Sequence, residues 1–331
     1  YAKFENYYKD QSQIKLANWE TVGQVSTDYN ALEKHIDIIL NAIDVTSIQQ
    51  SNLNVLVDPN NGTGCLADPL LLDKLKVNYT ILNKEGNGRF AHRPEPLKEN
   101  VTQISEELEK GNYDIGFVQD PDADRLVILD ENGRFIGEDY SLAFCVDYVL
   151  SQEESAEKRV VVNLSTSNIL EWVSRQYSAS ITYTKIGESN VTQAIKELNA
   201  TVGGEGNGGV IFPKVGWGRD SLTGIVLALK HLAEKKKSVS EIISTYPQYT
   251  MVREKFSVSN RDEVTEFLEK VKEKYNNREQ NTQDGVKVML DDAWVHVRPS
   301  NTEPILRIFI EAPTQQEANQ ILDEVMPLKS N

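Results

Sequence analysis

The sequence has little cysteine, no long apolar run and no excess of positive charge. Its two cysteines, Cys65 and Cys145, stand far apart in apolar surroundings, which argues against a disulfide framework or a zinc site and indicates a reducing, cytoplasmic location. No apolar run approaches the roughly 18 residues that cross a bilayer. The net charge of −15, from 35 basic and 50 acidic residues, disfavours nucleic acid and an anionic membrane as partners.

The chain also lacks an initiator methionine and a signal-peptide pattern. It begins Tyr-Ala-Lys-Phe, and no basic segment leads into an apolar stretch. We therefore expect that the chain begins inside a longer protein. Its 331 residues, 39% of them hydrophobic, are enough for two or three domains with cores of their own.

Alternating strand and helix patterns predict an α/β protein. Short apolar runs such as 54–58 and 159–163 indicate buried strands, and stretches with helical spacing lie between such runs. In the last quarter of the chain, strand patterns follow one another directly, which is typical of an antiparallel sheet covered by helices. We predict two consecutive α/β domains, 25–133 and 134–250, followed by a smaller α+β C-terminal domain, 251–331.

Three aspartates at alternate positions suggest a metal site. Asp120, Asp122 and Asp124 place three carboxylates within five residues, an arrangement that costs free energy unless a cation lies among them. Oxygen ligands alone suit a hard ion, Mg²⁺ before Ca²⁺ or Mn²⁺, and Arg125 can face a phosphate on the same metal. A solvated turn remains an alternative, whereas a calcium hand is disfavoured because Arg125 stands where that loop needs glycine.

A second loop, Gly203 to Gly209, contains five glycines together with Glu205 and Asn207. A carboxylate and an amide two residues apart can grip neighbouring hydroxyl groups of a sugar, and glycine lets the backbone approach a ligand closely. The alternative is a flexible hairpin without a ligand. The spacing differs from a dinucleotide-binding motif, so no nicotinamide cofactor is expected.

A third loop, residues 298–304, is dense in hydrogen-bond donors and suits a phosphate monoester. Two arginines can chelate phosphate oxygens, and a tight turn presents backbone N–H groups to an anion. The residues expected to bind the phosphate are Arg298, Ser300, Asn301, Thr302 and Arg307. An ordinary polar turn is the alternative.

Lys185, in Thr184-Lys-Ile-Gly187, is a candidate general acid/base if burial or a neighbouring arginine lowers its pKa, although a surface lysine is the commoner explanation. The four histidines share no metal-like spacing. His296 either lines a cleft or only packs in a strand.

In this order the loops resemble those of the α-D-phosphohexomutases, the family of phosphoglucomutases, phosphomannomutases and phosphoglucosamine mutases. The matching motifs are Asp-Pro-Asp-Ala-Asp-Arg, Gly-Gly-Glu-Gly-Asn-Gly-Gly and Arg-Pro-Ser-Asn-Thr-Glu-Pro. Asp58-Pro-Asn-Asn-Gly, Arg93-Pro-Glu-Pro96 and Gly218-Arg-Asp220 also fit, so the resemblance spans nearly the whole chain.

The resemblance implies four domains around a deep cleft, with a catalytic phosphoserine in the first and residues 1–24 as the tail of that domain. The serine phosphate would pass to a hexose phosphate, giving a bound hexose 1,6-bisphosphate (the activator) whose other phosphate returns to serine. The implied roles are Mg²⁺ binding by Asp120, Asp122 and Asp124, contact with the phosphoserine by Arg125, proton transfer by Lys185, sugar binding by Glu205 and Asn207, and phosphate binding by Arg298, Ser300, Asn301, Thr302 and Arg307.

The sequence departs from this family pattern at the nucleophile. The family's serine lies in a Thr-Ala-Ser-His-Asn-Pro-like loop, and no Ser-His pair occurs in these 331 residues. We therefore expect the chain alone to be inactive, either as a fragment without its nucleophile or as a homologue that has lost it. Pro121 and Ala123 stand where many relatives have glycine, and Asn207 stands where many have serine.

Phosphoglucosamine is the favoured substrate, because Glu-Gly-Asn-Gly-Gly loops resemble those of members assigned to it. A phosphomannomutase, a phosphoglucomutase and a non-catalytic sugar-phosphate-binding protein remain alternatives, and either a monomer or a homodimer is expected. An aspartate-nucleophile phosphatase using Asp120 is disfavoured, because the acidic pair Asp291-Asp292 is embedded in a strand pattern.

Overall fold

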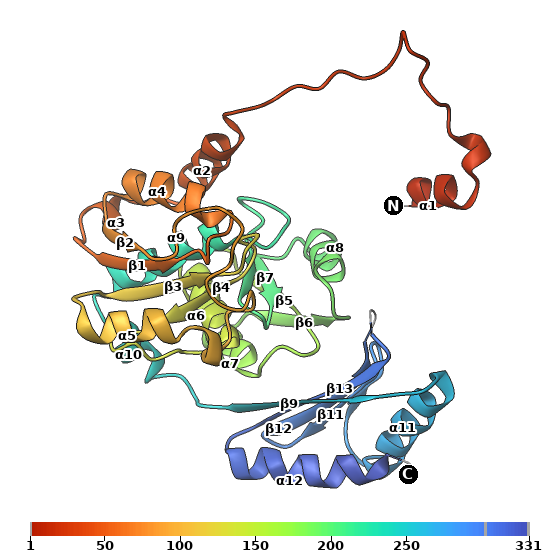
Figure 1. Ribbon diagram of the computed structural model, residues 1–331. Helices are drawn as coiled ribbons and strands as arrows, with labels where there is room; N and C mark the ends of the chain where they lie inside the picture. Colours follow the sequence, from red (N-terminus) through yellow and green to blue (C-terminus); the bar gives the residue numbers. More distant parts are fainter. Residues whose placement is uncertain (1, 301–302, 330–331) are drawn as a thin grey trace. The chain divides into compact units, whose positions relative to one another are not determined.

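The computed structural model describes residues 2–300 and 303–329, which belong to two units, one ending at His35 and the other beginning at Ile36. The first unit contains helix α1 (Ala2–Lys9), a 3-10 turn η1 (Gln11–Gln13) and a segment without regular structure that leads into helix α2 (Ala31–Ala42). All further description concerns the second unit, which holds the three sheets (Figure 1).

The first sheet has the order β2-β1-β3-β4. Its strands are β1 (Asn54–Asp58), β2 (Asn78–Ile81), β3 (Ile115–Gln119) and β4 (Leu126–Leu129). Helix α3 (Thr46–Gln49) precedes β1, helices α4 (Gly64–Leu75) and α5 (Thr102–Lys110) connect the parallel strands, and a 3-10 turn η2 (Lys98–Asn100) lies before α5. Strands β2, β1 and β3 are parallel, and β4 returns antiparallel beside β3. Buried side chains of α5 pack on β1 and β3, as parallel strands covered by helices require.

The second sheet repeats this plan in the order β6-β5-β7-β8. Its strands are β5 (Arg159–Asn163), β6 (Ser180–Thr184), β7 (Val202–Glu205) and β8 (Gly209–Ile211), and its helices are α6 (Glu138–Gln152), α7 (Ile169–Gln176), α8 (Glu188–Leu198), α9 (Ser221–Lys235) and α10 (Val239–Ile243). Again three strands are parallel and the last is antiparallel. The turns β3–β4 and β7–β8 therefore occupy equivalent positions in the two sheets.

Helices α6 and α9 join the two α/β halves. Most of their residues are buried, as expected of helices that are covered on all sides. The two helices pack on each other, and both contact β4 of the first sheet and β8 of the second. The first two sheets thus share a core around these helices.

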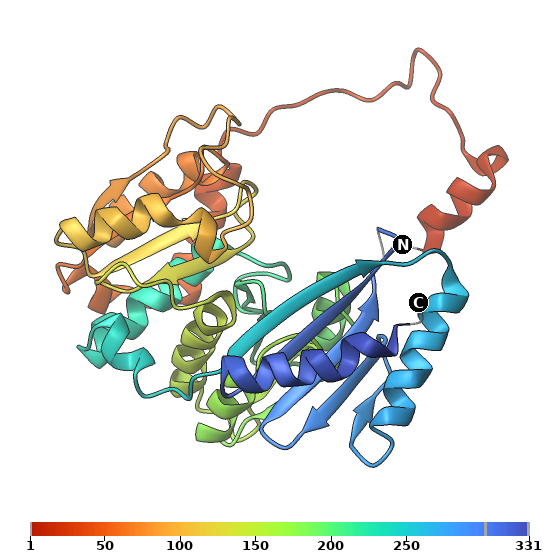
Figure 2. The ribbon, with the colours of Figure 1, turned by 60° about the horizontal axis from the view of Figure 1, so that its bottom comes forward.

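The third sheet is antiparallel, with the order β10-β11-β12-β13-β9 (Figure 2). Its strands are β9 (Thr250–Ser257), β10 (Gln280–Asn281), β11 (Val286–Leu290), β12 (Ala293–Pro299) and β13 (Ile305–Ala312), with helices α11 (Arg261–Lys274) and α12 (Gln315–Val325) and a final 3-10 turn η3 (Met326–Leu328). Val295 and Val297 face the helices together with Leu306 and Ile308. Because side chains alternate along a strand, the opposite face carries polar residues, including the cross-strand pair Arg298 and Arg307.

The observed architecture confirms the predicted fold class of two α/β domains followed by a smaller α+β domain. Helix α6 had no counterpart among the sequence patterns. Its apolar residues surround the whole helix, so the one-sided spacing that identifies a surface helix is absent. None of the described helices combines the length and the apolar character that a bilayer-spanning helix needs.

The turn after β1 supports the β3–β4 turn. Asn60 and Asn61 adopt left-handed conformations, with φ of +50° and +55°, which asparagine tolerates better than most residues. The Thr63 N–H donates to the Pro121 carbonyl at 2.8 Å. A Cβ at Gly62 would lie 2.4 Å from the same carbonyl oxygen, so this close approach requires glycine.

We predict that Gly62→Ala lowers the free energy of unfolding by about 1–3 kcal/mol, because the added methyl group forces the two turns apart. Urea denaturation provides the measurement. Gly216→Ala is the matched control, since nothing lies within 4 Å of a Cβ built there, and its effect is expected to stay within about 0.5 kcal/mol. Equal stability of the two variants would contradict the prediction.

Candidate functional site

The β3–β4 turn is organised by one aspartate. Asp120 Oδ1 accepts hydrogen bonds from the backbone N–H groups of Asp124 (3.1 Å) and Arg125 (3.0 Å), and its carbonyl accepts from Ala123 N (3.0 Å). Ala123 has a φ of +58°. These bonds fold the turn back on itself, so that the three alternate carboxylates gather on one side.

The three aspartates of this turn, called here the metal loop (residues 120–125), form a compact oxygen cluster. Ligand atoms of Asp120, Asp122 and Asp124 lie within 4.8 Å of one another. Burial raises the pKa of Asp120 to about 7, and the charges of the other two aspartates add to this rise. Asp124 Oδ1 is buried and has no hydrogen-bond partner. Clustered carboxylates with an unused oxygen suit a hard divalent cation such as Mg²⁺.

Arg125 lies beside the cluster, with its Nε 3.4 Å from Asp120 Oδ2 and 3.7 Å from Asp124 Oδ1. Its side chain is about 30% exposed, so the guanidinium both balances the carboxylates and reaches solvent. This placement suits contact with an anion next to the metal loop.

A series of buried side-chain hydrogen bonds supports the metal loop. Gln119 Nε2 donates to Asp68 Oδ1 (3.1 Å) and to Ser221 Oγ (2.9 Å), and Ser221 Oγ donates to the Ala123 carbonyl (2.7 Å). Asp68 is fully buried and its Oδ2 has no partner. Burial raises the pKa of Asp68 to about 8, so this carboxyl is mainly protonated at neutral pH.

The glycine-rich segment differs from the predicted loop. Residues 203–205 belong to strand β7, and the connection to β8 consists of residues 206–208 only. A Cβ at Gly203 would lie 2.5 Å from the Val161 carbonyl oxygen, and one at Gly204 would lie 2.4 Å from the Gly209 carbonyl oxygen. Glycine is needed at these two positions for close packing within the fold and not for approach to a ligand.

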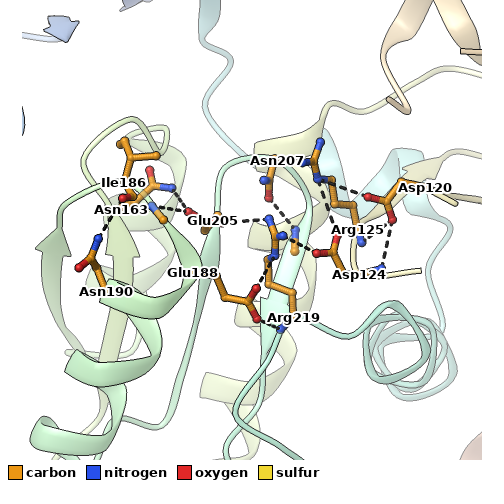
Figure 3. Close-up of polar contacts among 12 residues, drawn as sticks. Asp120, Asp124, Arg125, Asn163, Ile186, Glu188, Asn190, Glu205, Asn207 and Arg219 are labelled. Atoms are coloured by element: carbon orange, nitrogen blue, oxygen red, sulfur yellow. Dashed lines mark hydrogen bonds and ion pairs between the residues drawn. The ribbon is translucent and has the colours of Figure 1, made fainter. Parts of the chain in front are cut away.

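Glu205 is buried at the end of β7 and holds several partners. Its Oε1 accepts from Asn163 Nδ2 (2.9 Å) and from Gly187 N (3.1 Å), and its Oε2 accepts from Arg219 Nη1 (2.9 Å) (Figure 3). Asn207 Oδ1 accepts from Gly209 N at 3.3 Å. With Oδ1 engaged, Asn207 has its amide Nδ2 to offer a ligand. The end of β7 and the short turn after it, residues 205–208, are called here the sugar loop.

Arg219 was not selected as a site residue from the sequence, although it lies in the Gly218-Arg-Asp220 motif. Its guanidinium forms ion pairs with Asp124 and Glu205, and its Nε lies 3.6 Å from Glu188 Oε2. The sequence around Arg219 indicates only the start of a helix. Asp220, the next residue, caps α9 by accepting a hydrogen bond from Leu222 N at 3.0 Å. A helix cap next to an arginine gives no indication of which carboxylates that arginine meets.

Arg298 and Arg307 lie side by side on β12 and β13, as the predicted phosphate site requires. Arg298 is buried, and its Nε lies 3.6 Å from Asp284 Oδ2. Arg307 Nη2 donates to Glu303 at 2.9 Å, and Ser300 N donates to the Ile305 carbonyl at 2.9 Å. Asn301 and Thr302, which were expected to complete this site, lie outside the described residues.

These groups line one cleft of about 520 Å³. Its lining includes five arginines and four glutamates, namely Arg125, Arg219, Arg253, Arg298, Arg307, Glu95, Glu138, Glu188 and Glu205. A second hollow of about 320 Å³ is lined by Asp120 and Asp122 and shares Arg125 and Glu95 with the cleft. The metal loop therefore adjoins the cleft at Arg125.

The two remaining sequence candidates differ in position. Lys185 is exposed, and the cleft is lined instead by the two residues that follow it, Ile186 and Gly187. His296 is buried between Ser165 Oγ (2.9 Å from Nδ1) and the Asp284 carbonyl (2.7 Å from Nε2), and burial lowers the pKa of His296 to about 4. Because a carbonyl only accepts, Nε2 carries the proton and Nδ1 accepts from Ser165. His296 thus packs in the strand.

Models of one protein family match most of the chain. Descriptions of phosphoglucomutase/phosphomannomutase α/β/α domain II, α/β/α domain III and the C-terminal domain match residues 33–133, 137–249 and 254–328. The chain is 37% identical over 309 residues to a phosphoglucomutase/phosphomannomutase of Thermococcus kodakarensis, covering 93% of this chain and 67% of that protein. It is 34% identical to a probable phosphoglucosamine mutase of Methanopyrus kandleri, covering 95% of this chain and 69% of the relative.

Solved structures share the fold. A phosphoglucomutase/phosphomannomutase family protein of Burkholderia thailandensis superimposes with a TM-score of 0.84 at 23% identity, over 99% of this chain and 69% of that one. An Aspergillus fumigatus N-acetylphosphoglucosamine mutase, solved with GlcNAc-6P and magnesium, gives a TM-score of 0.66 at 15% identity over 93% and 72%.

We predict that Asp68→Asn changes the dependence of stability on pH. The folded-state pKa of Asp68, about 8, lies above the usual unfolded value of about 4. The stability that its protonation contributes is therefore present at low pH and is lost as the pH rises through about 8. The amide does not titrate, so the variant should gain stability relative to the original chain between pH 5 and pH 9.

Urea unfolding at both pH values measures this difference. Asp73→Asn, at an exposed position of the same helix, is the control and should show a smaller change with pH. A stability difference between Asp68→Asn and the original chain that stays constant with pH would show that Asp68 is not held in its protonated form.

Proposed function

The chain belongs to the phosphoglucomutase/phosphomannomutase family, and on that premise we propose that its cleft binds a hexosamine phosphate and Mg²⁺ for the interconversion of the 1-phosphate and the 6-phosphate. The observation that carries the proposal is the cleft with five arginines in a protein of net charge −15. The five arginines outnumber the four glutamates of the cleft lining, and an excess of positive charge at one place on an acidic protein favours an anionic ligand there.

Two groups of arginines would serve the two phosphates of a bisphosphate intermediate. Arg298 and Arg307, with Ser300, Asn301 and Thr302, would hold the phosphate that does not react, since paired guanidinium groups bind phosphate oxygens in bidentate fashion. Arg125 would face the phosphate that is transferred, at the junction of the cleft and the metal loop.

Asp120, Asp122 and Asp124 would hold Mg²⁺, and the closeness of their oxygens and the burial of Asp120 fit that role. When bound, Mg²⁺ supplies positive charge that offsets the charge of the transferred phosphoryl group. Lys185 stays a candidate for proton transfer, although a loop movement would be needed to bring its exposed side chain into the cleft.

The charges of the cleft also favour an amino sugar. Four glutamates line the cleft together with the arginines, so a ligand with an anionic phosphate and a cationic amino group matches both kinds of charge. Glu205 and Asn207 would contact the sugar as acceptor and donor. The phosphoglucosamine mutase name of the Methanopyrus kandleri relative agrees with this choice.

We predict that calorimetric titration of the chain shows tighter binding of glucosamine 1-phosphate than of glucose 1-phosphate or mannose 1-phosphate, with Mg²⁺ present. Arg298→Ala should weaken binding roughly 10- to 100-fold, the cost of a charge-assisted hydrogen bond. Arg278→Ala, which removes an exposed arginine of the same domain, is the control and should leave the affinity unchanged. Equal losses in the two variants would refute the phosphate assignment, and equal affinities for the three sugars would refute the amino-sugar preference.

A second candidate function is sugar-phosphate binding without turnover, favoured by the lack of a Ser-His pair. We expect the chain by itself to bind a hexosamine phosphate and to leave it unconverted. Incubation with glucosamine 1-phosphate, Mg²⁺ and glucosamine 1,6-bisphosphate, followed by ³¹P spectroscopy, measures conversion. Formation of the 6-phosphate would show that a nucleophile other than a serine next to histidine operates in this chain.

A further inference from the structure

One guanidinium connects the metal loop to the sugar loop. Arg219 precedes α9, and its Nη2 donates to Asp124 Oδ2 while its Nη1 donates to Glu205 Oε2 at 2.9 Å (Figure 3). Asp124 lies in the β3–β4 turn, and Glu205 ends β7 directly before the equivalent β7–β8 turn of the second sheet. The two terminal nitrogens of the Arg219 guanidinium therefore each bind one carboxylate, one from the metal loop and one from the sugar loop.

The guanidinium is itself held in place. The Arg219 side chain is only 11% exposed. Glu188 accepts from the Arg219 backbone N–H at 2.9 Å and lies 3.6 Å from its Nε. A Cβ at Gly209 would lie 2.2 Å from Arg219 Cδ, so the aliphatic part of the side chain passes closely over the start of β8. These contacts hold the Arg219 guanidinium in one orientation.

For the metal loop, this orientation separates the two oxygens of Asp124. Oδ2 is bonded to Arg219, whereas Oδ1 is buried without a hydrogen-bond partner. Arg125 Nε lies 3.7 Å from this Oδ1 and 3.4 Å from Asp120 Oδ2. Asp124 Oδ1 therefore lies on the side of the Asp120 carboxylate. Partners that hold the outer oxygen of a ligand in this way typically change metal affinity 10- to 100-fold when they are removed.

For the sugar loop, Arg219 limits what Glu205 can accept. A carboxylate has about four acceptor positions. Asn163 and Gly187 use Oε1, and Arg219 uses one position of Oε2. One position on Oε2 remains for a ligand donor, and the guanidinium fixes its direction.

We propose that Arg219 is a positioning residue shared by both subsites: it orients Asp124 as a Mg²⁺ ligand and Glu205 as a sugar ligand at the same time. The sugar half rests on the proposed function, whereas the Mg²⁺ half does not need it. A merely structural ion pair would change the stability of the fold without changing either affinity.

Arg219→Lys is the test, because lysine keeps the charge but carries a point-like ammonium that cannot hold two carboxylates as a fork does. Titration with Mg²⁺ alone should show a Kd about 10–100-fold higher than in the original chain. Titration with glucosamine 1-phosphate in the absence of Mg²⁺ should also show a higher Kd. An unchanged Mg²⁺ affinity in the folded variant overturns the proposal, and so does an original chain that binds no Mg²⁺.

Arg175→Lys is the matched control, since Arg175 lies exposed on α7 in an ion pair with Glu171, and both affinities should stay unchanged. If Arg219→Lys does not fold, Glu188→Gln removes the carboxylate that holds the guanidinium and keeps the other two contacts. Glu188→Gln should lower the affinities for Mg²⁺ and for glucosamine 1-phosphate. Unchanged affinities in this variant overturn the proposal. An original chain that binds Mg²⁺ but no sugar phosphate would refute the proposed function and the sugar half, while the Mg²⁺ titrations still decide the metal half.

Discussion

The contact between two equivalent turns is the constraint on which the rest of the site depends. Leu126 N, at the start of β4, donates to the Gly208 carbonyl at 3.1 Å. Gly208 has a φ of +89°, and a Cβ there would lie 2.3 Å from the Leu126 carbonyl oxygen. Glycine therefore permits the metal loop and the sugar loop to meet backbone to backbone, and only at this distance can one arginine reach carboxylates of both.

The repeated topology explains why these two turns meet. Each α/β half ends its parallel strands at the turn into an antiparallel edge strand, and ligand sites of α/β proteins gather at such strand ends. Helices α6 and α9 fill the space between the halves. Because these helices are buried on all sides, the halves cannot slide apart without exposing a large apolar surface.

The third domain contributes two arginines, Arg298 and Arg307, to the cleft of an acidic molecule. Its sheet turns one face to the helices α11 and α12 and the other, with Arg298 and Arg307, to the cleft. Hydrogen bonds from Ile186 N to Asp284 Oδ2 (2.9 Å) and from Lys287 Nζ to the Leu164 carbonyl (2.8 Å) join this domain to the segments that follow β6 and β5. Arg298, Arg307 and the sugar loop thus border one cleft.

Local features of this protein can be derived from the order of its amino acids: the alternation of strands and helices, the aspartate cluster of the metal loop, and the two arginines on neighbouring strands. These follow from side-chain periodicity and turn chemistry, which act over a few residues. Three features are evident only in the folded chain: Gly203 and Gly204 lie within a strand, Lys185 is exposed, and Arg219 meets Asp124, 95 positions away. Such pairings depend on the order of strands in a sheet and on the packing of buried helices, and no local pattern in the chain encodes either of them.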